Sequence, residues 1–212
     1  MKVFDSYLKN GFTQAGFFKE SVNFDRGYED PVHSIRRQSE GVYAMLHFLA
    51  YERENGRRHP EWEQKMKNML DILLQLQHED GSFPRKFHDD FTIVDNSGGS
   101  TPSATLPLIM GYKYFKDKRY LASAKRTADY LEKVLISKAD YFSSTLDANC
   151  EDKEASLYAA TATYYLSLIT KGDEHRHYAD LTRKAAYFAL SWYYVWDVPF
   201  AQGQMLGDIG LK

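Results

Sequence analysis

Carboxylates in the long connections of this sequence are the residues best suited to chemistry. Two polar stretches, 78–99 and 137–150, separate segments with helical periodicity, and loops longer than about 12–15 residues in a compact domain are usually functional or disordered. Asp95 lies in the first stretch and Asp147 in the second, each beside small polar residues. Hydrolysis of a glycosidic bond needs two carboxyl groups about 5–9.5 Å apart. We therefore take Asp147 and Asp95 as the candidate acid and base.

A second acidic group stands just before a segment with helical periodicity and has two interpretations. Glu151, Asp152 and Glu154 would occupy the start of that helix, where the positive end of the helix dipole stabilises negative charge. Capping by itself explains acids in such places. Asp152 is retained as a third catalytic candidate and Glu151 as a candidate substrate contact.

Basic and aromatic residues in the same stretches are candidate substrate contacts. Arg85 and Lys86 follow a turn at Gly81 and would bind a carboxylate or sulfate on a sugar, while a solvated charge pair is the plainer interpretation. Phe87 and Tyr141 offer rings for stacking against a sugar. Arg85 and these loop aromatics complete the expected site.

Other catalytic patterns are missing from the sequence. His175 and His177 have no third ligand in sight, so we expect no metal site. Cys150 has no neighbouring His, and the sequence contains neither a Gly-x-Ser-x-Gly nor a dinucleotide motif. We expect no cofactor.

The elements that position these residues repeat along the chain. An aromatic residue opens a helical segment and a Phe closes the loop after it in Trp62…Phe83, Tyr120…Phe142 and Tyr178…Phe200. Helical periodicity fills 34–54, 61–77, 100–115, 119–136, 151–170 and 175–196, with Pro107 expected to kink the third segment or delay its start. Short and long connections alternate, which predicts three stacked helical hairpins. We expect an all-α fold over 34–212 and an irregular lead-in over 1–33.

Composition narrows the class of partner. Lys plus Arg number 27 and Asp plus Glu 29, so no excess of positive charge favours nucleic acid or an anionic membrane. No apolar run is long enough for a membrane span, and residues 1–10 lack the apolar core of a signal peptide. We expect a soluble protein, and the compartment stays open.

Several segments resemble the six-hairpin glycosidase-like proteins. Gln77-His-Glu-Asp-Gly-Ser-Phe83, followed by Pro84-Arg-Lys-Phe87, is similar to the Gln-x-x-x-Gly-x-aromatic turns of their hairpins. The runs 144–155 and 197–208 also resemble segments of large bacterial proteins of this type. The resemblance covers about 34–208 and implies an alpha/alpha toroid and a carbohydrate substrate, without assigning a catalytic residue.

Only three of the six hairpins of such a toroid are present. A second copy of the chain, or the remainder of the same polypeptide, would complete the ring. Hydrolysis of a polysaccharide or oligosaccharide is the predicted activity. One alternative is a polysaccharide lyase, in which Tyr141 would be a better candidate for the catalytic base than the acids. Another is a non-catalytic repeat that binds carbohydrate or protein.

Overall fold

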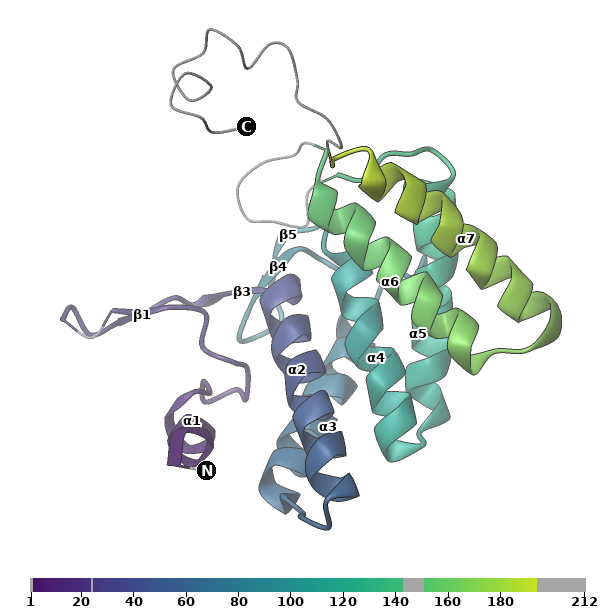
Figure 1. The fold of residues 1–212 in the computed structure, drawn as a ribbon. Helices are drawn as coiled ribbons and strands as arrows, with labels where there is room; N and C mark the ends of the chain where they lie inside the picture. Colours follow the sequence, from purple (N-terminus) through teal and green to yellow (C-terminus); the bar gives the residue numbers. More distant parts are fainter. Residues whose placement is uncertain (1, 24, 143–150, 194–212) are drawn as a thin grey trace, which may run out of the picture.

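The computed structural model describes residues 2–23, 25–142 and 151–193, which are predominantly helical (Figure 1). The helices of this part of the chain are α1 (Lys2–Asn10), α2 (Ile35–Glu54), α3 (Pro60–Leu76), α4 (Thr101–Phe115), α5 (Lys118–Tyr130), α6 (Lys153–Ile169) and α7 (Gly172–Leu190). A π-helical segment, η1 (Leu131–Ile136), extends α5. The predicted all-α class is confirmed.

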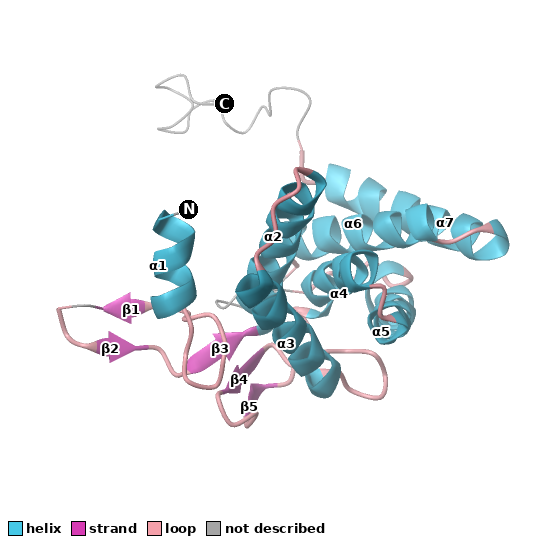
Figure 2. Cartoon of the chain, turned by 90° about the horizontal axis from the view of Figure 1, so that it is seen from below, coloured by secondary structure: helices cyan, strands magenta, loops and turns pink. Residues whose placement is uncertain are grey.

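The helices form the three predicted hairpins, α2–α3, α4–α5 and α6–α7. Helices α2, α4 and α6, the front helices, pack next to one another in a row, and each packs on the second helix of its hairpin, α3, α5 or α7 (Figure 2). The N-terminal ends of α2, α4 and α6 lie on the same side of the row, and the long connections lie on that side (Figure 1). This arrangement is a segment of an alpha/alpha toroid, as predicted.

Two stretches expected to be irregular contain regular structure. The lead-in holds α1 and the strands β1 (Val22–Asn23), β2 (Tyr28–Glu29) and β3 (Val32–Ser34). The first long connection holds β4 (Lys86–His88) and β5 (Ile93–Asp95), and β3, β4 and β5 form one antiparallel sheet. The helix was missed because a nine-residue helix gains its stability from packing, and the sheet because its partners are distant in sequence. The ring of Phe4 in α1 stacks on Phe48 at 4.4 Å between centroids.

The repeated aromatic residues occupy the core. Trp62, Phe83, Tyr120 and Tyr178 are buried, and Phe142 is partly buried. Phe200 lies outside the described residues. The buried rings belong to one hydrophobic core, and the ring of Trp62 packs on those of Phe4, Tyr7 and Phe12 in the lead-in.

Helix α4 is the centre of the row and is almost entirely buried. Its small residues, among them Ala104 and Gly111, let the neighbouring helices approach closely, and a Cβ at Gly111 would lie 2.5 Å from Leu70 Cδ1. The later start that Pro107 could impose is wrong, because α4 begins at Thr101 and continues through Pro107, whereas a kink at this proline stays a prediction. The cost of about 3 kcal/mol for an interior proline is offset by packing on the neighbouring helices.

The turn that resembles known hairpins has a structural role. Gln77 Nε2 donates to the carbonyl oxygens of Gly81 and Ser123 at 3.2 and 3.1 Å, and to Thr127 Oγ1 at 3.0 Å. Ser123 Oγ donates back to Gln77 Oε1 at 2.7 Å. One glutamine thus ties the end of α3 to α5 and fixes the loop that follows.

Candidate functional site

The sheet at the upper end of α2 brings Asp95 and Arg85 together. Arg85 Nη2 lies 2.6 Å from Asp95 Oδ2, and the two residues also share a backbone hydrogen bond of 2.7 Å. Burial raises the pKa of Asp95, but the Ser97 amide and the Arg85 guanidinium outweigh it and hold that pKa below its usual range. Asp95 is therefore an ionised carboxylate, a state that suits a base better than an acid.

The neighbours of Arg85 on β4 have different environments. Lys86 is partly buried and pairs through its backbone with Ser34 on β3 and with Asp95 on β5. Phe87 is 1% exposed and its ring packs on Phe17 at 5.1 Å. In this arrangement the Phe87 ring belongs to the core and offers no face to a sugar.

The acids before α6 are engaged with the backbone. Asp152 is the N-cap of α6, and its Oδ1 accepts a hydrogen bond from the Glu154 amide at 2.8 Å, so the capping interpretation is confirmed. Glu151 Oε2 accepts from the Tyr141 amide at 3.1 Å. Asp147 lies outside the described residues, so its catalytic role stays a prediction.

Tyr141 is a core residue in this structure. It is 1% exposed, and its ring lies 4.4 Å from that of Phe188. Burial, and to a lesser extent Glu151, raises the pKa of Tyr141 to about 12. A phenol with so high a pKa and no open face is poorly placed to remove a proton from a polymer.

Between α2 and α6 lies a charged cluster that sequence reasoning missed. Arg36 of α2 donates through Nε to Glu40 Oε1 at 3.0 Å and through Nη1 to Glu154 Oε2 of α6 at 2.8 Å. Tyr158 of α6 donates its hydroxyl hydrogen to the same Glu40 oxygen. One guanidinium thus joins the carboxylates of two front helices across α4.

The guanidinium limits how far apart the two carboxylates can lie. Two nitrogens bonded to one carbon are about 2.3 Å apart, so the bonded oxygens of Glu40 and Glu154 are at most about 8 Å apart. Glycoside hydrolysis uses carboxyl separations of about 5–9.5 Å, so this upper limit is compatible with that reaction but does not set the separation. Both carboxylates are 41% exposed, so a solute can reach them.

The protonation of the cluster follows from its contacts. Burial lowers the pKa of Arg36, but hydrogen bonds and charge attraction from Glu40 outweigh burial and raise it further above its already high value. Burial and the Glu40 carboxylate raise the pKa of Tyr158 to about 12. Arg36 is therefore a permanent cation and Tyr158 a neutral hydrogen-bond donor at ordinary pH.

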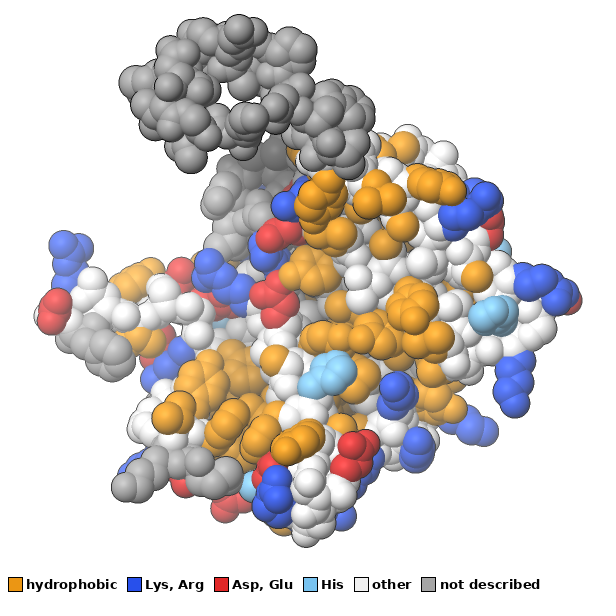
Figure 3. All heavy atoms as spheres, viewed as in Figure 1, with side chains coloured by type: hydrophobic (Ala, Val, Ile, Leu, Met, Phe, Trp, Pro, Cys, Tyr) orange, Lys and Arg blue, Asp and Glu red, His pale blue; other side chains and the backbone are white. Residues whose placement is uncertain are grey.

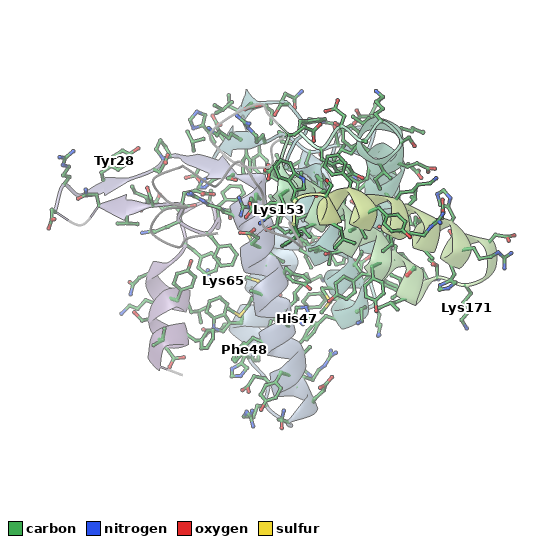
Figure 4. The ribbon with its side chains drawn as sticks, turned by 45° about the horizontal axis from the view of Figure 1, so that its top comes forward. Tyr28, His47, Phe48, Lys65, Lys153 and Lys171 are labelled. Atoms are coloured by element: carbon green, nitrogen blue, oxygen red, sulfur yellow. The ribbon has the colours of Figure 1, made fainter. Side chains whose placement is uncertain are left out.

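The same face continues below the cluster with hydroxyl and imidazole groups. Tyr43 Oη donates to Tyr165 Oη at 3.1 Å, again joining α2 to α6. His47 packs edge-on against Tyr43 at 4.6 Å, and burial together with Lys113 lowers the pKa of His47. Figure 4 labels His47 on α2 and Lys153 at the start of α6, which mark the two ends of this face.

The helical spacing of the polar residues on α2 could have revealed its part of the cluster. Arg36, Glu40, Tyr43 and His47 recur at i, i+4, i+7 and i+11, which places them on one face of α2. The apolar stripe of the same helix predicted its packing, whereas this polar stripe was overlooked. That Glu154 and Tyr158 lie opposite the polar stripe depends on how the hairpins pack.

Two other kinds of feature, a metal site and a membrane-spanning helix, were sought among the described residues. Among them, no group of three or more His, Cys, Asp and Glu side chains is placed to bind a metal ion. No helix in this part of the chain is long and apolar enough to cross a bilayer.

The row of front helices, with the long connections gathered at one end, matches part of the fold of the six-hairpin glycosidase-like proteins. No family model matches the sequence. The structure is similar to a cellobiose 2-epimerase from Spirochaeta thermophila, with a TM-score of 0.70 and 16% identity over 89% of this chain and 50% of that one.

Two further solved structures agree with this fold. A D-mannose isomerase matches with a TM-score of 0.67 and 17% identity, over 94% of this chain and 55% of its own. An unsaturated glucuronyl hydrolase from Streptococcus agalactiae matches at 0.63 and 12%, over 91% of this chain and 52% of its own. These identities establish the fold alone, and the chain spans about half the length of the structures it matches.

Proposed function

We propose that this chain supplies one wall of a carbohydrate-processing site and that Arg36, Glu40, Glu154 and Tyr158 contact the sugar. The observation that carries the proposal is the pair of accessible carboxylates held on one guanidinium on the front face. The cluster lies at the end of α2 and α6 where the long connections gather, and loops positioned by a rigid scaffold are common places for binding residues. The names of the similar structures are those of a hydrolase, an epimerase and an isomerase of sugars, which supports this class.

Within that class we propose hydrolysis of a glycosidic bond. Glu40 and Glu154 would share the proton transfers, one to the leaving oxygen and one from water, and Arg36 would release one of them as sugar hydroxyl groups replace its contacts. Asp95, Asp147 and Asp152 remain proposed members of the site, with Arg85, Lys86 and Glu151 as nearby polar groups. Tyr158 would keep Glu40 oriented.

A second reaction class has support of its own. The epimerase and the isomerase have the higher TM-scores of the three matches described. Their named reactions rearrange a sugar without breaking a glycosidic bond. A carboxylate beside a phenol can move a proton between carbon and oxygen, so the same cluster is compatible with this chemistry.

The test is turnover measured by proton NMR on a panel of sugars. The panel includes cellobiose, mannose, neutral oligosaccharides and oligosaccharides that end in an unsaturated glucuronyl residue. New reducing ends would indicate hydrolysis, and C2 epimers or ketoses would indicate rearrangement.

Variants connect the activity to the cluster. Glu40→Gln and Glu154→Gln are each expected to lower kcat by about 10²–10⁴-fold, since that is the usual contribution of a general acid or base. Glu61→Gln, an exposed residue in the first turn of α3, is the matched control and should not change the rate. Binding of a sugar without turnover would replace the enzymatic proposal with the binding-module alternative, and no response to any sugar would refute both.

A further inference from the structure

A cavity between α1 and α2 lies apart from the charged cluster. Its volume is about 320 Å³, which is within the size range of small-molecule sites. Figure 3 shows hydrophobic side chains gathered between the two helices, at the lower left. The apolar part of the lining consists of Phe4, Tyr7, Phe18, Ala44, Met45 and Phe48. Most of these side chains are aromatic, so the cavity offers an apolar ligand a large area of contact.

Contacts within the chain hold the walls of this cavity in place. The ring of Phe4 stacks on that of Phe48 at 4.4 Å between centroids. The Phe18 amide donates to Gln38 Oε1 at 2.9 Å, and Gln38 Nε2 donates to the Phe18 carbonyl oxygen at 2.8 Å. A Cβ added at Gly41 would lie 2.7 Å from Phe18 Cε2, so the glycine lets the Phe18 ring lie against α2. The cavity is therefore formed by the fold itself, as small-molecule sites usually are.

The polar part of the lining gathers at one end of the cavity and includes Lys19, Glu20 and Arg37. The Glu20 side chain is 1% exposed, and its Oε1 accepts hydrogen bonds from the Ser34 amide at 2.7 Å and from Gln38 Nε2 at 3.0 Å. These two donors satisfy the buried carboxylate without a cation. The lining thus has two cations and one carboxylate, and that carboxylate is already hydrogen-bonded.

Arg37 is the cation best placed to receive a ligand. Lys19 is ion-paired with Glu29 at 2.9 Å. Arg37 is 51% exposed and reaches Glu20 Oε2 through Nη1 at 3.2 Å, which is its one ion pair among the described residues. A guanidinium can bind a carboxylate through two nitrogens at once. The open end of the cavity therefore suits a carboxylate.

The cavity is long for its volume. Its lining residues on α2 run from Arg37 to Phe48, a distance of about 16 Å at a rise of 1.5 Å per residue. At about 30 Å³ each, the share of liquid volume taken by a water molecule, roughly ten non-hydrogen atoms fit in it. A long, narrow space with a charged end suits an extended chain better than a sugar or a fused ring. Octanoate, with eight carbons and two oxygens, has the matching size.

We propose that this cavity binds a medium-chain carboxylate, with the carboxylate at Arg37 and the hydrocarbon chain between α1 and α2. The site is distinct from the proposed sugar site. Arg37, Gly41, Ala44 and Phe48 each come directly after a residue of the polar stripe on α2, so they lie about 100° away around the helix. Loss of one activity therefore does not require loss of the other.

Isothermal titration calorimetry of the whole chain with octanoate tests the proposal, and we expect one ligand per chain. Hexanoate should bind roughly 15-fold more weakly, the factor for two methylenes that no longer leave water. Octylammonium has the same chain and the opposite charge, so it should bind about tenfold or more weakly than octanoate.

Two variants connect binding to the two ends of the cavity. Ala44→Phe should abolish binding, because Ala44 is an exposed residue of the wall and a ring there fills the space. Ala122→Phe, at an exposed alanine of α5, is its matched control. Arg37→Gln should weaken octanoate roughly tenfold or more. Arg183→Gln on α7, which also removes an exposed arginine paired with a carboxylate, should leave binding unchanged. Circular dichroism checks that each variant folds.

Amide chemical shifts in the NMR spectrum locate the ligand independently. Octanoate should move the signals of residues 4–10 and 37–48. Absence of binding at millimolar octanoate would overturn the proposal, as would equal affinity for octylammonium. Tighter binding of octyl glucoside would mean that the head group is a sugar instead of a carboxylate. Shifts confined to the exposed leucines of α6, Leu157 and Leu168, would place the ligand elsewhere.

Discussion

The turn at Gly81 gives the sharpest test of how the hairpins are joined. Gly81 has φ +91°, and a Cβ built on it would lie 2.2 Å from the backbone oxygen of Arg126 in α5. A backbone atom in a helix cannot move aside as the end of a flexible side chain can. Gly81→Ala should therefore push the first hairpin away from the second and break the contacts of Gln77.

The size of the effect can be separated into two parts. An L-residue in the left-handed region costs about 1–2 kcal/mol. Forcing a methyl group into a packed site costs about 1–3 kcal/mol more. Gly56→Ala is the matched control, because Gly56 has φ +75° and a Cβ added to it would meet nothing within 4 Å. We expect a loss of about 1–2 kcal/mol for Gly56→Ala and about 2–5 kcal/mol for Gly81→Ala.

The measurement is urea unfolding followed by far-ultraviolet circular dichroism at one temperature and protein concentration. The slopes with denaturant should agree between variants, so that the midpoints report the free energy of unfolding. If the two alanine variants lose the same free energy within about 0.5 kcal/mol, steric contact with α5 is not what fixes this turn, and the reasoning fails.

Two further predictions concern ion pairs. Replacing Arg85 by Met should lower the free energy of unfolding by about 3 kcal/mol, because it leaves the Asp95 carboxylate, 24% exposed, without its cation; an unchanged melting temperature in calorimetry would contradict this. Hydrogen bonds from Arg57 and His59 lower the pKa of Glu52 to about 2, so its stabilising contribution is complete above the unfolded pKa of about 4.3 and is lost as the pH falls toward 2. The melting temperature of the wild type should therefore fall more steeply between about pH 5 and pH 2 than that of Glu52→Gln, and parallel curves would rule out this role.

The candidate site shows where sequence reasoning stops. Asp95 and Arg85 were both singled out from their loop, but only the sheet β3–β4–β5 reveals that they form an ion pair. Phe87 and Tyr141 looked like loop aromatics, yet each is 1% exposed. Burial of a loop residue depends on what folds over it, and local sequence carries no such information.

The sequence by itself determined the hairpins, because amphipathic periodicity, caps and turn glycines act within a few residues of one another. Helices α2 to α7 begin close to their predicted starts, and Trp62, Phe83, Tyr120 and Tyr178 lie in the core. Only the tertiary structure decided that Arg36 and Glu40 face Glu154 and Tyr158. Glu40 and Tyr158 are 118 positions apart, and such contacts form because the small, buried helix α4 lets its two neighbours reach across it.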